Sequence, residues 1–186
     1  MDNTINNISF RANVKSISKI KNKEAFVEVK KLFENSTKND IKDTMYITDG
    51  IMGYNRIVIG DSYKSLFTRG INEQLKTMGT EDFAKKLVKI YESLKSHEKA
   101  IEKNNELNSE LNRAKALLKI NRSISSACAT EGKTGIARRF SVLAQRNEQK
   151  IDALTKEINN RLNTFNKKID ELSEQYEELS DLKINL

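Results

Sequence analysis

Two apolar rows with heptad spacing constrain this chain most, because they mirror each other across its C-terminal half. The first row, within residues 83–118, begins Phe83, Leu87, Ile90, Leu94, His97, Ile101. The second, within residues 158–179, is Ile158, Leu162, Phe165, Ile169, Leu172, Tyr176. When the rows are paired antiparallel, the residue numbers of facing members add to 259, which places a reversal near Thr130. The spacing predicts an antiparallel coiled-coil helical hairpin over residues 80–186, with its turn near 123–135 beside Gly132 and Gly135.

Composition agrees with a slender structure. The chain has 186 residues, of which 37% are hydrophobic, 32% charged and 6% aromatic, and it contains no Pro. Such a composition supports a thin core better than a thick one, and the absence of Pro permits long uninterrupted helices. We therefore expect the first helix of the hairpin to begin at Thr80 and to run to about residue 122.

The first 79 residues show different periods, which predict a small α+β head. Alternating residues from Ile8 to Lys15 indicate a strand, and a helical period from Lys23, capped by Asn22, fades by Asn39. Residues 45–48 and 54–59 then indicate two strands joined by a tight turn at Asp49-Gly50. A second helix, capped by Asp61 or Ser62 and ending at Gly79, would present Phe67, Ile71, Leu75 and Met78. The fold class predicted is thus α+β and mostly helical, with a three-stranded β-α-β-β-α head at 1–79 and the hairpin at 80–186.

The mirrored spacing fails nearer the turn, where it would set Asn108 against Ile151 and Leu111 against Glu148. One explanation is a stutter, in which the seam continues in another phase. In that case Leu107, Leu111, Ala114 and Leu118 would meet Leu154, Leu143 and Phe140. The other explanation is a polar layer that fixes the register, as a buried Asn does in a coiled coil. We favour the stutter.

Charge is concentrated around the predicted turn. Residues Arg113 to Lys150, called the tip from here on, contain nine Lys and Arg against two Glu, a net charge of +7 that equals the formal charge of the whole chain. Five of the nine arginines of the chain lie in the tip, and the planar guanidinium suits carboxylate or phosphate. The partner-binding residues that we predict are Arg122, Lys133, Arg138, Arg139 and Arg146.

Three interpretations of the tip remain open. It can contact an acidic protein surface, including the acidic C-terminal end of a second copy, which holds Asp170, Glu171, Glu174, Glu177, Glu178 and Asp181. Alternatively it contacts the phosphates of a nucleic acid, although only Phe140 could stack on a base. A solvated basic face without a partner is the third interpretation. The function we predict is a non-enzymatic interaction or scaffold protein with an acidic partner, and the alternative is a nucleic-acid-binding module.

Other motifs predict no catalytic, cofactor or metal site. Residues 127–134 match the loosest form of a phosphate-binding loop, but the strand that should precede it is poor, so a helix turn with Thr134 as cap is expected instead. His97 lacks partners at ligand spacing and is expected in the seam, while Cys128 is expected to be an ordinary loop residue. We therefore predict no enzymatic activity and no small-molecule substrate.

The N-terminal residues and the hydropathy of the chain predict a cytoplasmic protein. No basic segment followed by an apolar run opens the chain, and no window approaches the roughly 18 apolar residues of a membrane span. The single Cys128 excludes a disulfide framework within the chain.

Overall fold

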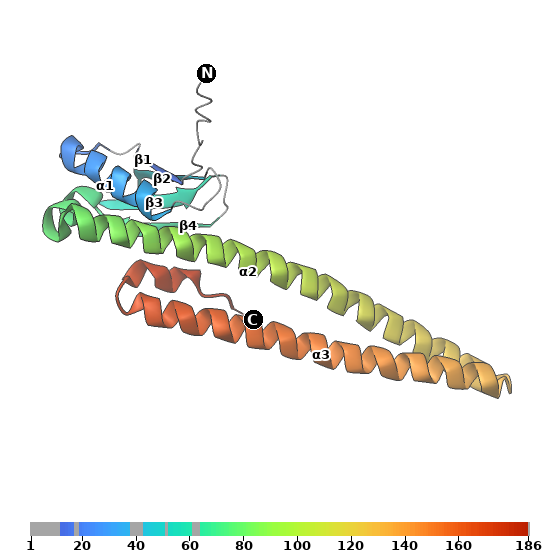
Figure 1. Cartoon of the computed structure of the whole chain (residues 1–186). Helices are drawn as coiled ribbons and strands as arrows, with labels where there is room; N and C mark the ends of the chain where they lie inside the picture. The colour runs from blue at the N-terminus through green and yellow to red at the C-terminus, as the bar shows by residue number, and fades with distance from the viewer. Residues whose placement is uncertain (1–11, 17–18, 38–42, 51, 61–63, 186) are drawn as a thin grey trace, which may run out of the picture. The chain divides into compact units, whose positions relative to one another are not determined.

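The computed structural model describes residues 12–16, 19–37, 43–50, 52–60 and 64–185. Their elements follow the order β1-α1-β2-β3-β4-α2-α3-η1 (Figure 1). The described residues form two compact units. The first comprises the residues up to Glu98 together with Ile169–Lys183, and the second comprises Lys99–Lys168 with the end of the chain from Ile184. The boundary between the units after Glu98 lies beyond the predicted domain boundary at residue 79. A separately folding head at 1–79 stays a prediction.

A mixed four-stranded sheet forms the base of the first unit, with the strands in sequence order. Strand β1 (Asn13–Ser16) pairs parallel with β2 (Thr44–Asp49), and α1 (Lys23–Ser36) connects the two. Strands β3 (Tyr54–Ile59) and β4 (Ser65–Arg69) add to it in antiparallel order. Three of these strands and α1 were predicted, and the side chain of Asn22 caps α1 by accepting from the Ala25 N–H at 3.1 Å as expected. The predicted residues 8–11 of the first strand lie outside the described ones.

One face of the sheet is buried and the other is open, which is the alternation that half-buried strands require. The buried face carries Val14, Met45, Ile47, Ile57 and Leu66. Helix α1 brings Phe33 into the core, where its ring meets Tyr91 of α2 edge-on at 5.6 Å between centroids. The aromatic pair shows that α1 and α2 (Ile71–Thr130) share the core of this unit.

Strand β4 corrects the prediction of a helix over residues 65–69 and of a three-stranded head, while the predicted caps Asp61 and Ser62 lie outside the described residues. Leu66 and Thr68 are buried in β4 while Phe67 is exposed, so the period there is two. Helix α2 begins only at Ile71, because the Gly70 carbonyl accepts the N–H of Gln74 at 3.1 Å. The spacing Phe67, Ile71, Leu75 had suggested one helical face, but it joins a strand residue to two helical ones.

Gly79 interrupts α2 where the sequence predicted a helix end. Its φ of 80° and ψ of 175° are not helical, so residues 71–78 and 80–130 are two helical stretches joined at this glycine. A side chain is disfavoured in this conformation, and this explains the need for Gly. The longer stretch begins at Thr80 as predicted and continues to Thr130, eight residues beyond the predicted end.

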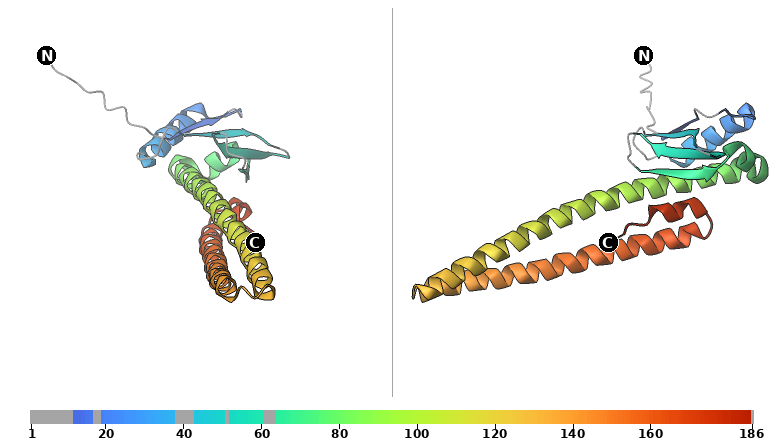
Figure 2. Two further views of the ribbon diagram at one scale, coloured as in Figure 1. Left: turned by 90° about the vertical axis from the view of Figure 1, so that its right-hand side faces the viewer. Right: turned by 180° about the vertical axis from the view of Figure 1, so that it is seen from behind.

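The second unit is the predicted helical hairpin, since α2 and α3 (Thr134–Ser173) pack together antiparallel (Figure 2). Lys150 of α3 lies 3.2 Å from the Glu110 carboxylate, and the Ser125 hydroxyl donates to the Ala137 carbonyl at 2.9 Å. The buried residues along its seam include Leu107, Leu111, Ala114, Ala144, Leu154, Ile158 and Leu162. Beyond α3, Asn166 pins the chain end, because its amide both accepts from and donates to the backbone of Ile184 at 2.9 Å.

Burial along α2 supports a change of phase in the seam. Leu107 is buried where the mirrored spacing had placed Asn108, and Leu111 and Ala114 continue from it. On α3 the predicted Leu143 is exposed, and Ala144 takes the buried position instead. Polar side chains also enter the seam, since Asn121 is buried and the Asn104 Oδ1 has no hydrogen-bond partner among the described residues. Burial on α2 therefore favours the stutter, with Leu143 as an exception on α3, and a polar layer that fixes the register stays a prediction.

Candidate interaction site at the end of the helical hairpin

A short capped turn reverses the chain at residues 131–133. The Lys133 N–H donates to the Cys128 carbonyl at 2.8 Å, and Gly132 adopts a positive φ of 74°, as at a helix end closed by glycine. Helix α3 then begins at Thr134, with the Lys133 carbonyl accepting from Ala137 at 3.0 Å. Thr134 is therefore the first residue of α3 and not its cap.

The same geometry shows that residues 127–134 do not form a phosphate-binding loop. These residues form the last turn of α2 and the reversal, so no strand delivers the pattern. The N–H groups of Glu131 and Gly132 donate to the carbonyls of Ala127 and Ala129, both at 3.1 Å. Amides bonded within the helix end cannot surround a phosphate. The predicted helix turn is confirmed, whereas Cys128, expected in a loop, is helical and half-buried.

Three of the five predicted partner-binding residues lie together. Arg138, Arg139 and Arg146 of α3 line one shallow surface pocket with Gly135, Val142 and Leu143. All three arginines are exposed. Their guanidinium groups therefore border apolar side chains, a combination that the sequence interpretation of a purely basic tip did not include.

The other two predicted residues lie elsewhere in the tip and already have acidic neighbours. Arg122 of α2 forms an ion pair with Glu148 of α3. Lys133 in the turn lies 2.6 Å from the Glu131 carboxylate. Both pairs are largely exposed, so each contributes little to stability and can exchange for a stronger partner.

Large apolar side chains are exposed in the tip, and this is the feature that the sequence interpretation missed. Within the described part of the second unit, every large hydrophobic residue that counts as exposed lies in the tip: Leu117, Ile120, Ile136, Val142 and Leu143. The signal was present in the sequence as a second apolar period beside the seam. Leu117, Ile120 and Ile124 recur at intervals of three and four on α2, and Ile136, Phe140 and Leu143 do so on α3.

The two sides of the tip differ in chemistry. On one side, Leu117 shares a surface groove with Glu110, Arg113, Ala114, Asn147 and Lys150. On the other, a second groove is lined by Arg122, Ser125, Ser126, Ser141, Ala144, Gln145 and Glu148. We call this second groove the serine face. Each side holds one ion pair, Glu110–Lys150 on the first and Arg122–Glu148 on the serine face. The first side also exposes the large apolar Leu117, whereas the serine face is lined by small and polar residues.

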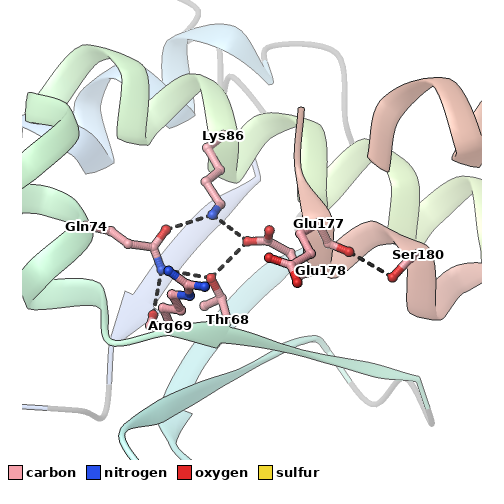
Figure 3. A network of polar contacts seen from close by, with 7 residues as sticks. All are labelled: Thr68, Arg69, Gln74, Lys86, Glu177, Glu178 and Ser180. Carbon is pink, nitrogen blue, oxygen red and sulfur yellow. Dashed lines mark hydrogen bonds and ion pairs between the residues drawn. The ribbon is translucent and has the colours of Figure 1, made fainter. Parts of the chain in front are cut away.

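The first unit contains a second candidate, a ring of polar contacts shown in Figure 3. The Lys86 ammonium donates to Gln74 Oε1 at 2.7 Å and lies 2.5 Å from Glu178 Oε1. Thr68 closes the ring, because its hydroxyl accepts from Gln74 Nε2 and donates to Glu178 Oε1, both at 2.8 Å. The ring lines a pocket of about 470 Å³ that Tyr54, Phe67 and Met78 also border.

This ring joins three elements and compensates its charges internally. Thr68 belongs to β4, Gln74 and Lys86 to α2, and Glu178 to η1 (Glu177–Leu182), a 3₁₀ segment whose Leu179 and Leu182 are buried. A second contact uses the acidic end in the same way, since Asp170 pairs with Lys183. Two of the acidic residues considered for head-to-tail association are thus engaged within the chain, which weakens that interpretation.

His97 is buried, with 9% of its surface exposed, as expected for a seam residue. Burial lowers the pKa of its imidazole, and the Lys64 ammonium lowers that pKa further against an opposing effect of Glu98. Among the described residues, no group of three or more His, Cys, Asp or Glu side chains could hold a metal ion.

Comparison with protein-family models, with curated proteins and with solved structures finds no match for this chain. None of the helices in the described ranges is long and apolar enough to cross a membrane.

Proposed function

We propose that this chain is a non-enzymatic interaction protein whose helical hairpin presents its tip to an acidic protein partner. The observation that carries the proposal is the surface pocket in which Arg138, Arg139 and Arg146 lie beside Val142 and Leu143. Protein interfaces combine apolar contact with arginine, because the guanidinium forms bidentate bonds to carboxylates while its flat faces pack on apolar groups.

The charge of the tip supports an acidic partner. It contains nine Lys and Arg residues but only two acidic residues, and both acidic residues are already paired with cations of the tip. A net +7 confined to 38 residues, Arg113 to Lys150, raises the encounter rate with an acidic surface and disfavours a basic one.

Affinity purification with mass spectrometry tests this proposal in nuclease-treated extracts. We expect acidic proteins captured by the wild-type chain to be lost with Arg138→Glu/Arg139→Glu. The matched control is Lys167→Glu/Lys168→Glu, because this pair is adjacent, exposed and on the same helix but outside the tip. Capture of the same proteins by all three chains would contradict a role for the tip.

The alternative is a nucleic-acid-binding module that uses the same cations. It is favoured by the end-on concentration of exposed Lys and Arg, which suits phosphate contacts with counterion release. It leaves the exposed apolar side chains unexplained. A steep loss of affinity for mixed duplex DNA with rising salt, abolished by Arg138→Glu/Arg139→Glu, would support it; absence of binding at low salt would eliminate it.

A further inference from the structure

The residues of the tip are distributed by size in a way that does not suit a two-helix coil. In a two-stranded coil, large apolar residues fill the seam. Here the buried seam positions of the tip are held by Ala114, Asn121, Ala137 and Ala144. Leu118, on the same face as Ala114, is half-buried. Most other large apolar residues of the tip lie beside the seam, so part of its apolar surface faces outward.

Six of these residues form what we call the apolar strip: Leu117, Ile120, Ile124, Ile136, Phe140 and Leu143. The exposed fractions of Leu117, Ile120, Ile136 and Leu143 are 42%, 52%, 46% and 40%, while Ile124 and Phe140 are half-buried. Each half of the strip recurs at intervals of three and four residues, so each half follows one face of its helix.

Both halves of the strip lie on the same side of the hairpin. The ion pair between Glu110 and Lys150 spans that side, and Leu117 shares a groove with Asn147 and Lys150. On α3, Phe140 and Leu143 precede Asn147 by seven and four residues, which places them along the same helical face. The strip is therefore a pair of parallel apolar rows, one from each helix.

Two such rows are the surface that a third amphipathic helix fills with apolar residues at i, i+3, i+4 and i+7. A membrane surface fits less well, because the extreme end of the hairpin is Glu131-Gly132-Lys133 and offers no apolar side chain for insertion. A second copy of the tip fits less well too, since each copy carries a net charge of +7.

The borders of the strip are cationic. Arg113 and Arg139 each precede a strip leucine by four residues, and both are exposed. Lys150 is exposed too and pairs with Glu110 at this border, so the cations still outnumber the acidic residue. We propose that the apolar strip binds an amphipathic helix of a partner protein, with acidic residues flanking its apolar face, and that this helix completes a three-helix bundle. The inference rests on the proposed function, because it assigns the structural class of the acidic partner.

The test measures fluorescence anisotropy of designed 21-residue peptides with the full chain. One peptide places Leu at the a and d heptad positions and Glu at the flanking e and g positions. A second carries Lys in place of the Glu residues, and a third scrambles the first. We expect the Glu-flanked peptide to bind about tenfold or more tightly than either of the others.

Matched variants then locate the site. Leu117→Asp/Leu143→Asp should weaken binding of the Glu-flanked peptide at least about tenfold. The control Ser126→Asp/Ser141→Asp adds the same charge to the serine face and should change binding less than about twofold. Circular dichroism checks the helical content of both, and Leu117→Gln/Leu143→Gln replaces the first variant if that content falls.

The outcomes separate this inference from the proposed function. Equal weakening by both Asp variants overturns the strip as the site but leaves an acidic partner of the tip standing. Absence of peptide binding, with capture of acidic proteins still dependent on Arg138 and Arg139, does the same. Strip-dependent binding to phosphatidylserine vesicles, or strip-dependent self-association, without peptide binding overturns the inference in favour of a membrane surface or a second copy. Absence of both peptide binding and tip-dependent capture refutes the function as well.

Discussion

Neutralising Glu178 should destabilise the first unit far more than its place in a short 3₁₀ segment suggests. Its carboxylate accepts from the Thr68 hydroxyl and pairs with the Lys86 ammonium, and the side chains of Glu178 and Lys86 are only 8% and 12% exposed. Removing one partner of a buried pair costs about 3–5 kcal/mol, because the remaining charge stays desolvated. Lys86 keeps Gln74 as a partner and some access to solvent, so we expect about 3 kcal/mol for Glu178→Gln.

The double variant Lys86→Met/Glu178→Leu tests the cause of this cost. It removes both charges and replaces them with apolar side chains. It should therefore lower the free energy of unfolding by less than Lys86→Met or Glu178→Leu does alone. The coupling energy between the two positions should then exceed about 1 kcal/mol.

Tyrosine fluorescence during urea unfolding suits this measurement. The chain has no Trp, and all five tyrosines lie within residues 1–98 and 169–183, so the signal reports on the first unit. Additive costs for the two single variants, or a Glu178→Gln cost below about 0.5 kcal/mol, would refute the reasoning and make the ring an ordinary surface contact.

Three further predictions concern the scaffold. Burial lowers the pKa of His97 in the folded chain, so the unfolded chain binds the proton first as the pH falls, and stability should decrease below about pH 6.5. The variant His97→Gln should reduce the dependence of the urea midpoint on pH over that range. An unchanged pH dependence would exclude His97 as its cause. Gly79→Ala should lower the free energy of unfolding by about 1–3 kcal/mol, because Gly79 has a φ of 80°. Gly135→Ala should leave it unchanged or raise it, because Gly135 is in α3 and nothing lies within 4 Å of the added Cβ. Equal thermal midpoints of the two variants would contradict this prediction. In chemical denaturation, Leu94→Ala at a fully buried site should lower the free energy of unfolding by about 3 kcal/mol. Leu117→Ala at an exposed site should lower it by less than about 1 kcal/mol. The reverse order would contradict the assignment of Leu94 to the core and of Leu117 to the surface.

The sequence predicted the hairpin because its signal is periodic over many turns. The first row lies in the helical stretch 80–130, and the second lies in the 40-residue α3 except for Tyr176, which follows its end at Ser173. Gly132 lies in the observed turn. Predictions for short elements are less secure, because such elements contain too few residues to distinguish one period from another. Strand β4 is only five residues long, and its Phe67 continued the helical spacing of Ile71 and Leu75 by coincidence.

The composition of the tip was only partly predictable. Its charge is a property of the sequence, so the exposed Arg138, Arg139 and Arg146 were found from it. The apolar strip was missed because an apolar period is normally assigned to the core, and only the packed structure shows Ala114 and Ala144 buried while Leu117 and Leu143 are exposed. The ring around Glu178 was unpredictable for another reason, since it joins Thr68 to a residue 110 positions later.

Pulsed electron paramagnetic resonance between spin labels at positions 110 and 150 tests the hairpin most directly, in a Cys128→Ser background that removes the only native thiol. Glu110 and Lys150 lie 3.2 Å apart through their side chains on helices whose axes should be about 10 Å apart, so the label separation should be below about 20 Å. A separation on the order of 60 Å, the length of 40 helical residues, would show that the chain continues straight past residue 131 and would remove the tip on which the proposed function depends.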